Sequence, residues 1–336
     1  MNLNSIGLNH YLSQVKKSKL ALPKQSGSLA RIFSEHKTGW DLISEQGPIK
    51  GILMSSVRKK TATDDLPKVG DWVVFEKIPT ENKAKIIQIL PRYTKLVRHI
   101  EKKRINQTIA TNIDQMFIVL STDQIFNPSQ LNRYLAIALE GKIDPIVIIN
   151  KIDKQTDSST NAKLITKEIK SIHPNQKIIL SSAITKTGLI ELDKYIKAGY
   201  TGVLVGNSGV GKSSLVNALL EEANQLTNEV SELGKGRHTT TSRKIFVLPS
   251  NGIIIDTPGM RTLEFDSTKE SSTEIFSNLN SISKNCKYRN CDHIKSAGCA
   301  LQTALSKKII TVKQLEQFLA LSGKHEQKVS YNKSRN

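Results

Sequence analysis

The stretch Gly206-Asn207-Ser208-Gly209-Val210-Gly211-Lys212-Ser213-Ser214 decides the fold of this chain. It follows a short apolar run at 203–205 and precedes residues 215–220, whose apolar side chains have the spacing of one helix face. A glycine-rich loop between a strand and a helix turns successive backbone N–H groups inward around phosphate oxygens, and the helix directs its positive end at them. A turn that matches by chance would not need these flanking elements. We therefore expect all nine residues to bind a nucleoside triphosphate.

Side chains of this loop and of a later turn have expected roles at the phosphates. Lys212 would reach the β- and γ-phosphates and support catalysis, while the hydroxyl of Ser213 would bind Mg²⁺. Downstream, Asp256-Thr257-Pro258-Gly259 directly follows the apolar run 253–255. Asp256 would reach the Mg²⁺ through water, and the Gly259 N–H would contact the γ-phosphate. An ordinary turn is the alternative, but the position after a buried strand favours the magnesium and nucleotide site.

A second motif, Asn150-Lys151-Ile152-Asp153, ends the apolar run at 145–149. The carboxylate of Asp153 can accept hydrogen bonds from N1–H and the exocyclic amine of guanine, which adenine does not offer, and Lys151 can lie along the base. The carboxyl end of a strand is where α/β proteins bind ligands, so this motif favours GTP over ATP. Ser182 and Ala183 end the next strand, where their backbone could close over the guanine O6.

The segment 234–241 lies between the helix of the phosphate loop and the strand that ends before Asp256, where a switch loop is expected. A threonine here would complete the Mg²⁺ shell when GTP is bound. The distance to the strand that begins at Ile245 favours Thr241, with Thr240 as the alternative.

Catalysis of the water attack needs a residue other than glutamine in this chain. Many GTPases place a glutamine directly after the glycine of Asp-x-x-Gly, but that position is Met260 here. We therefore expect His238, on the switch loop, to be catalytic; contact with phosphate or RNA alone is the alternative. Arg237 and Arg243 are weaker candidates for an arginine finger.

These motifs occur in an unusual order along the chain. Ordinary GTPases begin with the phosphate loop and end with the guanine-reading motif, whereas here residues 150–153 precede residues 206–214. The order indicates a circular permutation, which a sheet tolerates when the old termini lie close together at the surface. Strands alternate with helices over 101–278, so we predict a circularly permuted α/β P-loop GTPase domain with a doubly wound sheet.

The residues before this domain follow another pattern. Over 27–100, five short apolar or alternating runs with glycines near their bends predict a small β-barrel, and an oligonucleotide-binding (OB-type) barrel fits the number of strands. Some such barrels bind RNA and others are structural modules, so the fold alone leaves RNA binding open. Residues 1–26 are predicted to be a basic extension, in which Leu8, Leu12 and Val15 have the spacing of a short helix.

Residues 279–336 contain every cysteine of the chain. One histidine lies among them, in the pattern Cys286-x4-Cys291-x-His293-x5-Cys299. Three thiolates and an imidazole make a complete tetrahedral set for one structural Zn²⁺, with no open position for catalysis. An odd number of cysteines also argues against a disulfide framework. We predict a small, α-rich zinc-binding domain that ends in a helix and a basic tail.

Charge and composition narrow the class of partner. The 336 residues carry 49 Lys and Arg against 30 Asp and Glu, a net charge of +19. This surplus attracts polyanions such as nucleic acid, although a lysine-rich surface alone would have the same composition. No apolar run of about 18 residues is present, and the N-terminus lacks the order of a secretory signal. We expect a cytoplasmic monomer without a membrane partner.

The combination of these features resembles one family. A barrel, then a permuted GTPase with Gly-Arg-His-Thr-Thr-Thr at 236–241 and Asp-Thr-Pro-Gly-Met at 256–260, then Cys-x4-Cys-x-His-x5-Cys, is similar to the RsgA (YjeQ) family over about residues 27–325. The resemblance implies a protein that binds the small ribosomal subunit late in its assembly, contacts its rRNA and hydrolyses GTP faster when bound. It also supports a catalytic role for His238. Some members carry threonine where this chain has Asn150.

Other functions remain open at this point. The chain could be a P-loop GTPase or ATPase that acts on another RNA or ribonucleoprotein, or a kinase; Asn150 and Asp153 argue against the ATP-dependent choices. It could also be an RNA-binding scaffold that merely retains nucleotide. Four intact residues argue against that choice: Lys212, Ser213, Asp256 and His238.

Overall fold

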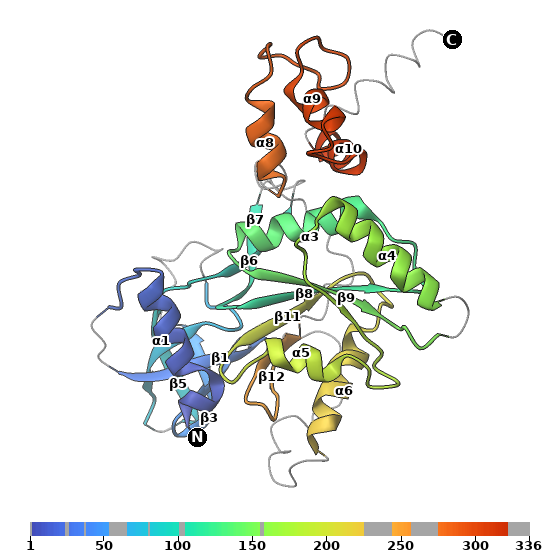
Figure 1. Ribbon diagram of the computed structural model, residues 1–336. Helices are drawn as coiled ribbons and strands as arrows, with labels where there is room; N and C mark the ends of the chain where they lie inside the picture. The colour runs from blue at the N-terminus through green and yellow to red at the C-terminus, as the bar shows by residue number, and fades with distance from the viewer. Residues whose placement is uncertain are drawn as a thin grey trace, which may run out of the picture.

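The computed structural model describes residues 2–23, 27–36, 38–53, 66–79, 81–100, 105–154, 158–224, 244–256 and 275–321. Figure 1 shows an N-terminal barrel, a central sheet covered by helices and a small helical C-terminal region. Within these ranges, no helix is both long and apolar enough to cross a membrane.

Five strands form the N-terminal barrel: β1 (Ser28–His36), β2 (Gly39–Ser44), β3 (Gly47–Leu53), β4 (Trp72–Lys77) and β5 (Lys83–Ile89). They are hydrogen-bonded in the order β1-β2-β3-β5-β4, and β4 pairs back with β1, so the sheet closes on itself. The β3–β5 pair is parallel and the other pairs are antiparallel. Ile32, Leu42 and Ile86 fill the interior with Val73 and Phe75. The predicted OB-type barrel is confirmed.

The N-terminal segment packs on the outside of this barrel. It forms a short 3₁₀ helix, η1 (Leu3–Ile6), and helix α1 (Leu8–Lys17). Ile6, Tyr11 and Val15 are buried against Trp72 and Leu90 of the barrel. The hydrophobic spacing in the sequence indicated the helix, and the structure shows which surface it covers.

The central sheet continues from the barrel without a break. Its strands are β8 (Gln115–Ser121), β9 (Asp144–Asn150), β10 (Ile178–Leu180), β11 (Thr201–Val205), β12 (Lys244–Val247) and β13 (Ile253–Asp256). They lie in the order β10-β9-β8-β11-β13-β12, parallel except for β12. The antiparallel pair Ser34–Lys244 joins β12 to β1 of the barrel. One eleven-stranded sheet therefore includes both regions.

Four helices cover the two faces of this sheet (Figure 1). They are α3 (Pro128–Glu140), α4 (Ser158–Ile172), α5 (Leu189–Tyr195) and α6 (Lys212–Asn224). Leu131 of α3 and Ile169 of α4 share a core with Val203 and Val205, whereas α5 and α6 pack on the other face, against Leu204 and its neighbours. Alternate residues of β11 therefore point to opposite cores, and the doubly wound sheet predicted for the GTPase domain is confirmed.

A polar network fixes the barrel and α1 to the central sheet. The Arg31 side chain is buried, and its Nη1 donates to Ile6 O at 2.7 Å while its Nη2 donates to Thr201 Oγ1 at 2.8 Å. Asp114 accepts from the Thr201 N–H at 2.7 Å and lies 2.7 Å from His10 Nε2. The start of β11 is therefore hydrogen-bonded to both the barrel and the N-terminal segment.

A hairpin of β6 (Lys95–Ile100) and β7 (Ile105–Thr111) lies across the predicted domain boundary between residues 100 and 101. Its residues Leu96, Ile109 and Ala110 are buried in the core that α3 and α4 also share. The hairpin thus packs with the central sheet although half of it precedes the predicted boundary. The boundaries themselves stay predictions.

The C-terminal region has its own small core and rests on α3 and α4. Its helices are α8 (Ser277–Ser283), α9 (Ala300–Ser306) and α10 (Val312–Leu321), with Phe276, Leu301 and Phe318 in their core. Asn132 Nδ2 of α3 donates to Gln317 Oε1 of α10 at 3.0 Å, and Gln314 Nε2 donates to Ile172 O at 3.2 Å. These contacts hold α10 across the ends of both helices.

His173 lies under this contact and makes it sensitive to acid. Its Nε2 lies 2.6 Å from Asn132 Oδ1 and its ring lies 5.3 Å from that of Phe276. Burial lowers the pKa of His173 from 6.5 to about 4, because a charged ring would lose its hydration here. The unfolded chain binds this proton near its ordinary pKa, so the stability that neutral His173 contributes is fully present above that value. It is lost as the pH falls towards the folded pKa, by up to ~3 kcal/mol.

We predict that the melting temperature of the protein decreases between pH 7 and pH 5, and that His173→Gln flattens this decrease. The glutamine amide can still donate to Asn132 but does not titrate. The measurement is the thermal unfolding of both proteins at several pH values within this range, which includes the ordinary pKa of histidine. Equal slopes in both proteins would contradict the assignment of the effect to His173.

Candidate functional site

The phosphate loop, 206–211, joins β11 to α6 at the carboxyl edge of the sheet. Gly206 and Gly211 have φ values of 141° and 95°, which side chains with a Cβ rarely adopt. A Cβ on Gly206 would lie 2.3 Å from Val119 O, and one on Gly211 would lie 2.3 Å from Asn150 Nδ2. The two glycines therefore let the loop pass directly against the ends of β8 and β9.

Lys212 begins α6, and its side chain folds back over the loop. Its Nζ donates to Gly206 O and Asn207 O, both at 2.7 Å. Ser213 and Ser214 are exposed in the first turn of the helix. The ammonium thus lies among the main-chain groups of the loop, where the phosphates of a nucleotide would compete with the two carbonyls for it.

Asn150, the last residue of β9, connects two loops from a buried position. It is 1% exposed, its Nδ2 donates to Val210 O at 2.9 Å, and its Oδ1 accepts from Ser181 Oγ at 3.1 Å. The amide therefore holds the phosphate loop and the loop after β10 against the end of β9. Ile152, two residues later, packs partly buried on the core shared by α3 and α4.

Lys151 and Asp153 diverge from Asn150 towards different loops. Lys151 has a φ of 63°, and its Nζ donates to Gly209 O of the phosphate loop at 2.5 Å. Asp153 Oδ1 accepts from Ser182 Oγ at 2.5 Å. Ala183 follows on the same loop and packs against the core of α5 and α6. The structure thus brings together the residues that the sequence predicted from two separate motifs.

Two glutamines that sequence reasoning missed also contact the phosphate loop. Gln124 Nε2, from the segment between β8 and α3, donates to Ser208 O at 3.0 Å. Gln130 of α3 makes two hydrogen bonds with Asn207. Its Nε2 donates to Asn207 Oδ1 at 2.5 Å, and its Oε1 accepts from Asn207 Nδ2 at 3.0 Å. No motif surrounds either glutamine, and only the adjacency of β8 and β11 brings them to the loop. The sequence therefore held no local signal for either glutamine.

Asp123 lies in the same segment, beside the guanine-reading motif. Its carboxylate accepts from Lys151 Nζ at 3.0 Å and is also hydrogen-bonded to Lys154 and Ser121. Burial raises the pKa of Asp123, but the hydrogen bonds from Lys154, Ser121 and Lys151 outweigh burial and hold the pKa well below its ordinary value. The carboxylate is therefore ionised at neutral pH.

Asp256 ends β13, the strand next to β11 on the side opposite β8. In the pairing of these strands, Val203 lies opposite Ile255, so Asp256 follows at the same edge as the phosphate loop. His238, Thr240, Thr241 and Gly259 lie outside the described residues, as do Met260, Arg237 and Arg243. The predictions made for them stay predictions.

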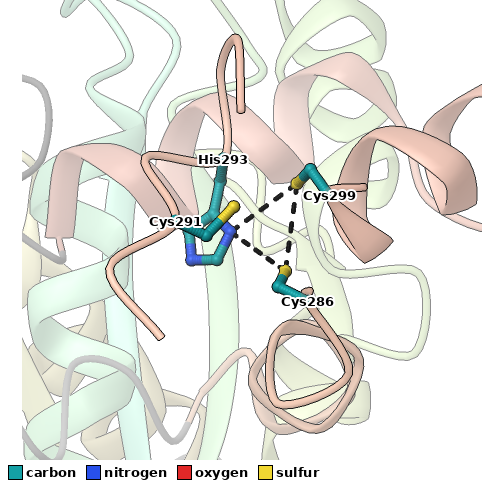
Figure 2. A group of neighbouring side chains, drawn as sticks. All are labelled: Cys286, Cys291, His293 and Cys299. Atoms are coloured by element: carbon teal, nitrogen blue, oxygen red, sulfur yellow. Dashed lines mark hydrogen bonds between the residues drawn. The ribbon is translucent and has the colours of Figure 1, made fainter. Parts of the chain in front are cut away.

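The second predicted site lies in the C-terminal region, where Cys286, Cys291, His293 and Cys299 converge (Figure 2). One ligand atom from each lies within 4.8 Å of all the others. His293 Nδ1 is 3.5 Å from Cys286 Sγ and 3.7 Å from Cys299 Sγ, and these two sulfurs are 4.0 Å apart. Tetrahedral Zn²⁺ with ordinary bond lengths would separate such atoms by ~3.5–3.8 Å. The cluster could hold one metal ion of this kind.

Hydrogen bonds from the surrounding backbone hold the ligand loop in place. Asp292 Oδ1 accepts from the N–H groups of Ile294, Lys295 and Ser296 at 2.8, 3.0 and 3.0 Å. The N–H of Ala300 donates to Cys286 Sγ at 3.4 Å, a contact that helps to fix the position of this sulfur. All three cysteines are free of disulfide bonds. The donor set and its support therefore fit structural Zn²⁺.

Comparison with known proteins places this arrangement in a family. A family model described as RsgA GTPase matches residues 89–266. The small ribosomal subunit biogenesis GTPase RsgA of Methanosarcina acetivorans is 36% identical over 294 residues, which covers 87% of this chain and 78% of the relative. The chain belongs to the RsgA GTPase family. Membership confirms that the protein is a GTPase, as the phosphate loop and the Asn150–Asp153 motif predicted.

Two solved structures share the fold. The crystal structure of YjeQ from Thermotoga maritima has a TM-score of 0.66 at 22% identity, covering 88% of this chain and 97% of that one. The crystal structure of YloQ, described as a circularly permuted GTPase, has a TM-score of 0.62 at 24% identity and covers 92% of this chain and 96% of that one. The predicted circular permutation is confirmed by the fold.

We predict that a strong chelator removes one zinc per chain and unfolds the C-terminal region while the central sheet stays folded. The core around Leu301 and Phe318 is small, so it needs the metal bonds to stay ordered. Hydrogen exchange would lose its protection in α9 and α10 and keep it in β8 and β11. Cys291→Ser should reproduce this loss without chelator, and Ser283→Ala should not. Unchanged protection after complete removal of zinc would contradict a structural site.

Proposed function

We propose that this protein hydrolyses GTP while bound to the small ribosomal subunit during biogenesis of that subunit. The packing of the guanine-reading motif on the phosphate loop carries the proposal. Asn150 contacts Val210 and Lys151 contacts Gly209, so one nucleotide can place its base at 150–153 and its phosphates at 206–213. A nucleotide of this length bridges the two motifs only because they lie at one edge of the sheet.

The base would be read by Asp153 and held by its neighbours. The Asp153 carboxylate would accept from guanine N1–H and the exocyclic amine, and the Lys151 stem would lie along the ring. Ser182 already orients Asp153 through a hydrogen bond to Oδ1, and the backbone of Ala183 would face the guanine O6. Adenine offers neither donor to Asp153, so discrimination against ATP follows from a partly buried carboxylate left without the two donors of guanine.

The phosphates would bind along the loop and the start of α6. Main-chain N–H groups of residues 207–213 would donate to the phosphate oxygens, and Lys212 would exchange its carbonyl partners for the β- and γ-phosphates. The hydroxyl of Ser213 and the carboxylate of Asp256 fit Mg²⁺, which prefers hard oxygen ligands. When bound, Mg²⁺ neutralises charge on the phosphates; Thr241, or Thr240, would add a further ligand.

We assign the attack of water to residues of the switch loop. His238 would orient the water, since Met260 has no polar group for it. Lys212 would withdraw charge from the γ-phosphate during the attack. Because His238 is assigned to the attacking water and Asp153 to the base, substitution of His238 should alter hydrolysis without altering base recognition.

The partner follows from charge and from the relatives. Proteins 33% and 36% identical to this chain are named small ribosomal subunit biogenesis GTPases. The net charge of +19 would attract the phosphates of rRNA, and an OB-type barrel is a common RNA-binding module. Contact with rRNA, a cytoplasmic location and action as a monomer belong to the same proposal.

We predict that purified small ribosomal subunits stimulate GTP turnover at least ~10-fold and leave ATP turnover at background. The stimulation would arise because contact with the subunit positions catalytic groups at the γ-phosphate. The measurement is phosphate release with and without subunits, with large subunits as the control for general polyanion effects. Unchanged turnover, or equal stimulation by both subunits, would overturn the small subunit as the partner.

We predict that His238→Ala lowers the stimulated turnover of GTP by roughly 100-fold and leaves GTP affinity within about twofold of wild type. The loss would follow from a poorly oriented water, while the base and phosphate contacts persist. Glu191→Ala, at an exposed position of α5 outside the barrel, serves as the control. Normal stimulated turnover in His238→Ala would remove the catalytic assignment and leave the nucleotide site standing.

A further inference from the structure

The segment between β8 and α3 contacts both halves of the nucleotide site. Gln124 holds Ser208 of the phosphate loop, and Asp123 holds Lys151 of the guanine-reading motif. Lys151 in turn donates to Gly209. A chain of hydrogen bonds therefore runs from Asp123 through the Lys151 ammonium to the phosphate loop.

We propose that Asp123 is a positioning residue for guanine nucleotides, because its carboxylate fixes the Lys151 ammonium against Gly209 and so places the Lys151 stem where the base will lie. This inference rests on the proposed nucleotide site. Asp123 itself would touch neither the base nor the reacting phosphate; it acts through Lys151.

The geometry of the pair supports a directed role. The side chains of Asp123 and Lys151 are 25% and 26% exposed, so water screens their attraction less than at an open surface. Lys151 has several rotatable bonds and a strained φ of 63°. Two fixed acceptors, Asp123 Oδ2 at 3.0 Å and Gly209 O at 2.5 Å, restrict the ammonium to one place before the nucleotide arrives. Pre-placement lowers the entropic cost of binding.

The direction in which nucleotide affinity changes when the Asp123 carboxylate is removed distinguishes a positioning role from a purely electrostatic effect. GDP and GTP are polyanions, so removing a carboxylate near the phosphate loop should, by charge alone, strengthen their binding. A positioning role requires the opposite, since Lys151 would lose an anchor. Lys154 also contacts Asp123 but is 50% exposed. Among the described residues it has no hydrogen bond to the phosphate loop, so its removal leaves the Asp123–Lys151 pair intact.

The test uses the full chain loaded with N-methylanthraniloyl-GDP and chased with excess GDP. We expect Asp123→Asn to speed dissociation about 3- to 10-fold, with the change in steady-state turnover falling on KM for GTP rather than on kcat. Asp123→Glu should restore most of the wild-type rate, because a carboxylate on a longer arm can still reach Lys151. Lys154→Ala should change the rate less than about twofold. Asp193→Asn is the matched control, since its carboxylate contacts Ser250, away from the site.

Unchanged or slower dissociation in Asp123→Asn would overturn the inference, as would failure of Asp123→Glu to restore the rate. Failure of the underlying site is distinguishable with Asp153→Asn. That amide can donate to the C2 carbonyl of xanthine, so it should exchange preference for GDP for preference for xanthosine diphosphate. If it does so while Asp123→Asn stays like wild type, the site stands and only the role of Asp123 is lost. If Asp153→Asn keeps its preference for GDP, the site assignment and the inference fall together.

Discussion

The side chain of Asn150 is the link on which the nucleotide site depends. It ends β9 in a buried position and bonds both to the phosphate loop, at Val210, and to the loop after β10, at Ser181. If these hydrogen bonds were broken, the buried amide of Asn150 would lack partners, which would destabilise the fold. The Val210 carbonyl and the Ser181 hydroxyl would also lose a partner, at a further cost in free energy. The hydrogen bonds therefore fix three loops in one relative position, and the remaining residues of the site build on that position.

This constraint also explains why the order of the motifs can be permuted. The contacts at the carboxyl edge need β9 and β11 to lie on either side of β8, with all three strands parallel. This arrangement in space does not depend on the order in which the strands occur in the chain. The connection from α5 to β11 spans residues 196–200 and lies at the amino edge, opposite the site. There the Thr201 N–H bonds to Asp114 and its hydroxyl bonds to Arg31. The new connection is thus anchored without disturbing the nucleotide loops.

The sequence predicted this site well where chemistry is local in the chain. Glycine spacing at 206–211, the four residues 150–153 and the cysteine spacing each specify a structure over a few positions. The barrel and the doubly wound sheet followed from hydrophobic periodicity. Asp123, Gln124 and Gln130 could not be found in this way, because each acts across a pair of strands. Gln124 and Ser208 are 84 residues apart, and a polar segment after a strand has no period that reveals its partner.

The same limit applies to the contacts between regions. Arg31 and Thr201, 170 residues apart, are both unremarkable in the sequence, although their bond fixes the barrel to the central sheet. The packing of the hairpin β6–β7 with the central sheet was not predicted, because the sequence around residue 100 is basic and is typical of an exposed segment. The apolar side chains of the hairpin are buried against α3, which is too distant in the chain for a local hydrophobic pattern to reveal the contact.

Helix α3 supports both the phosphate loop and the metal-binding region. Gln130, in its first turn, is hydrogen-bonded to Asn207 of the phosphate loop. Asn132, two residues later, is hydrogen-bonded to Gln317 of α10, which belongs to the metal-binding region. Asn127 caps the same turn through the Gln130 N–H. Because a hydrogen-bonded helical turn moves as a unit, the phosphate loop and the metal-binding region are held by one rigid piece of backbone. The C-terminal region is therefore connected to the nucleotide site through α3, although every metal ligand lies outside the central sheet.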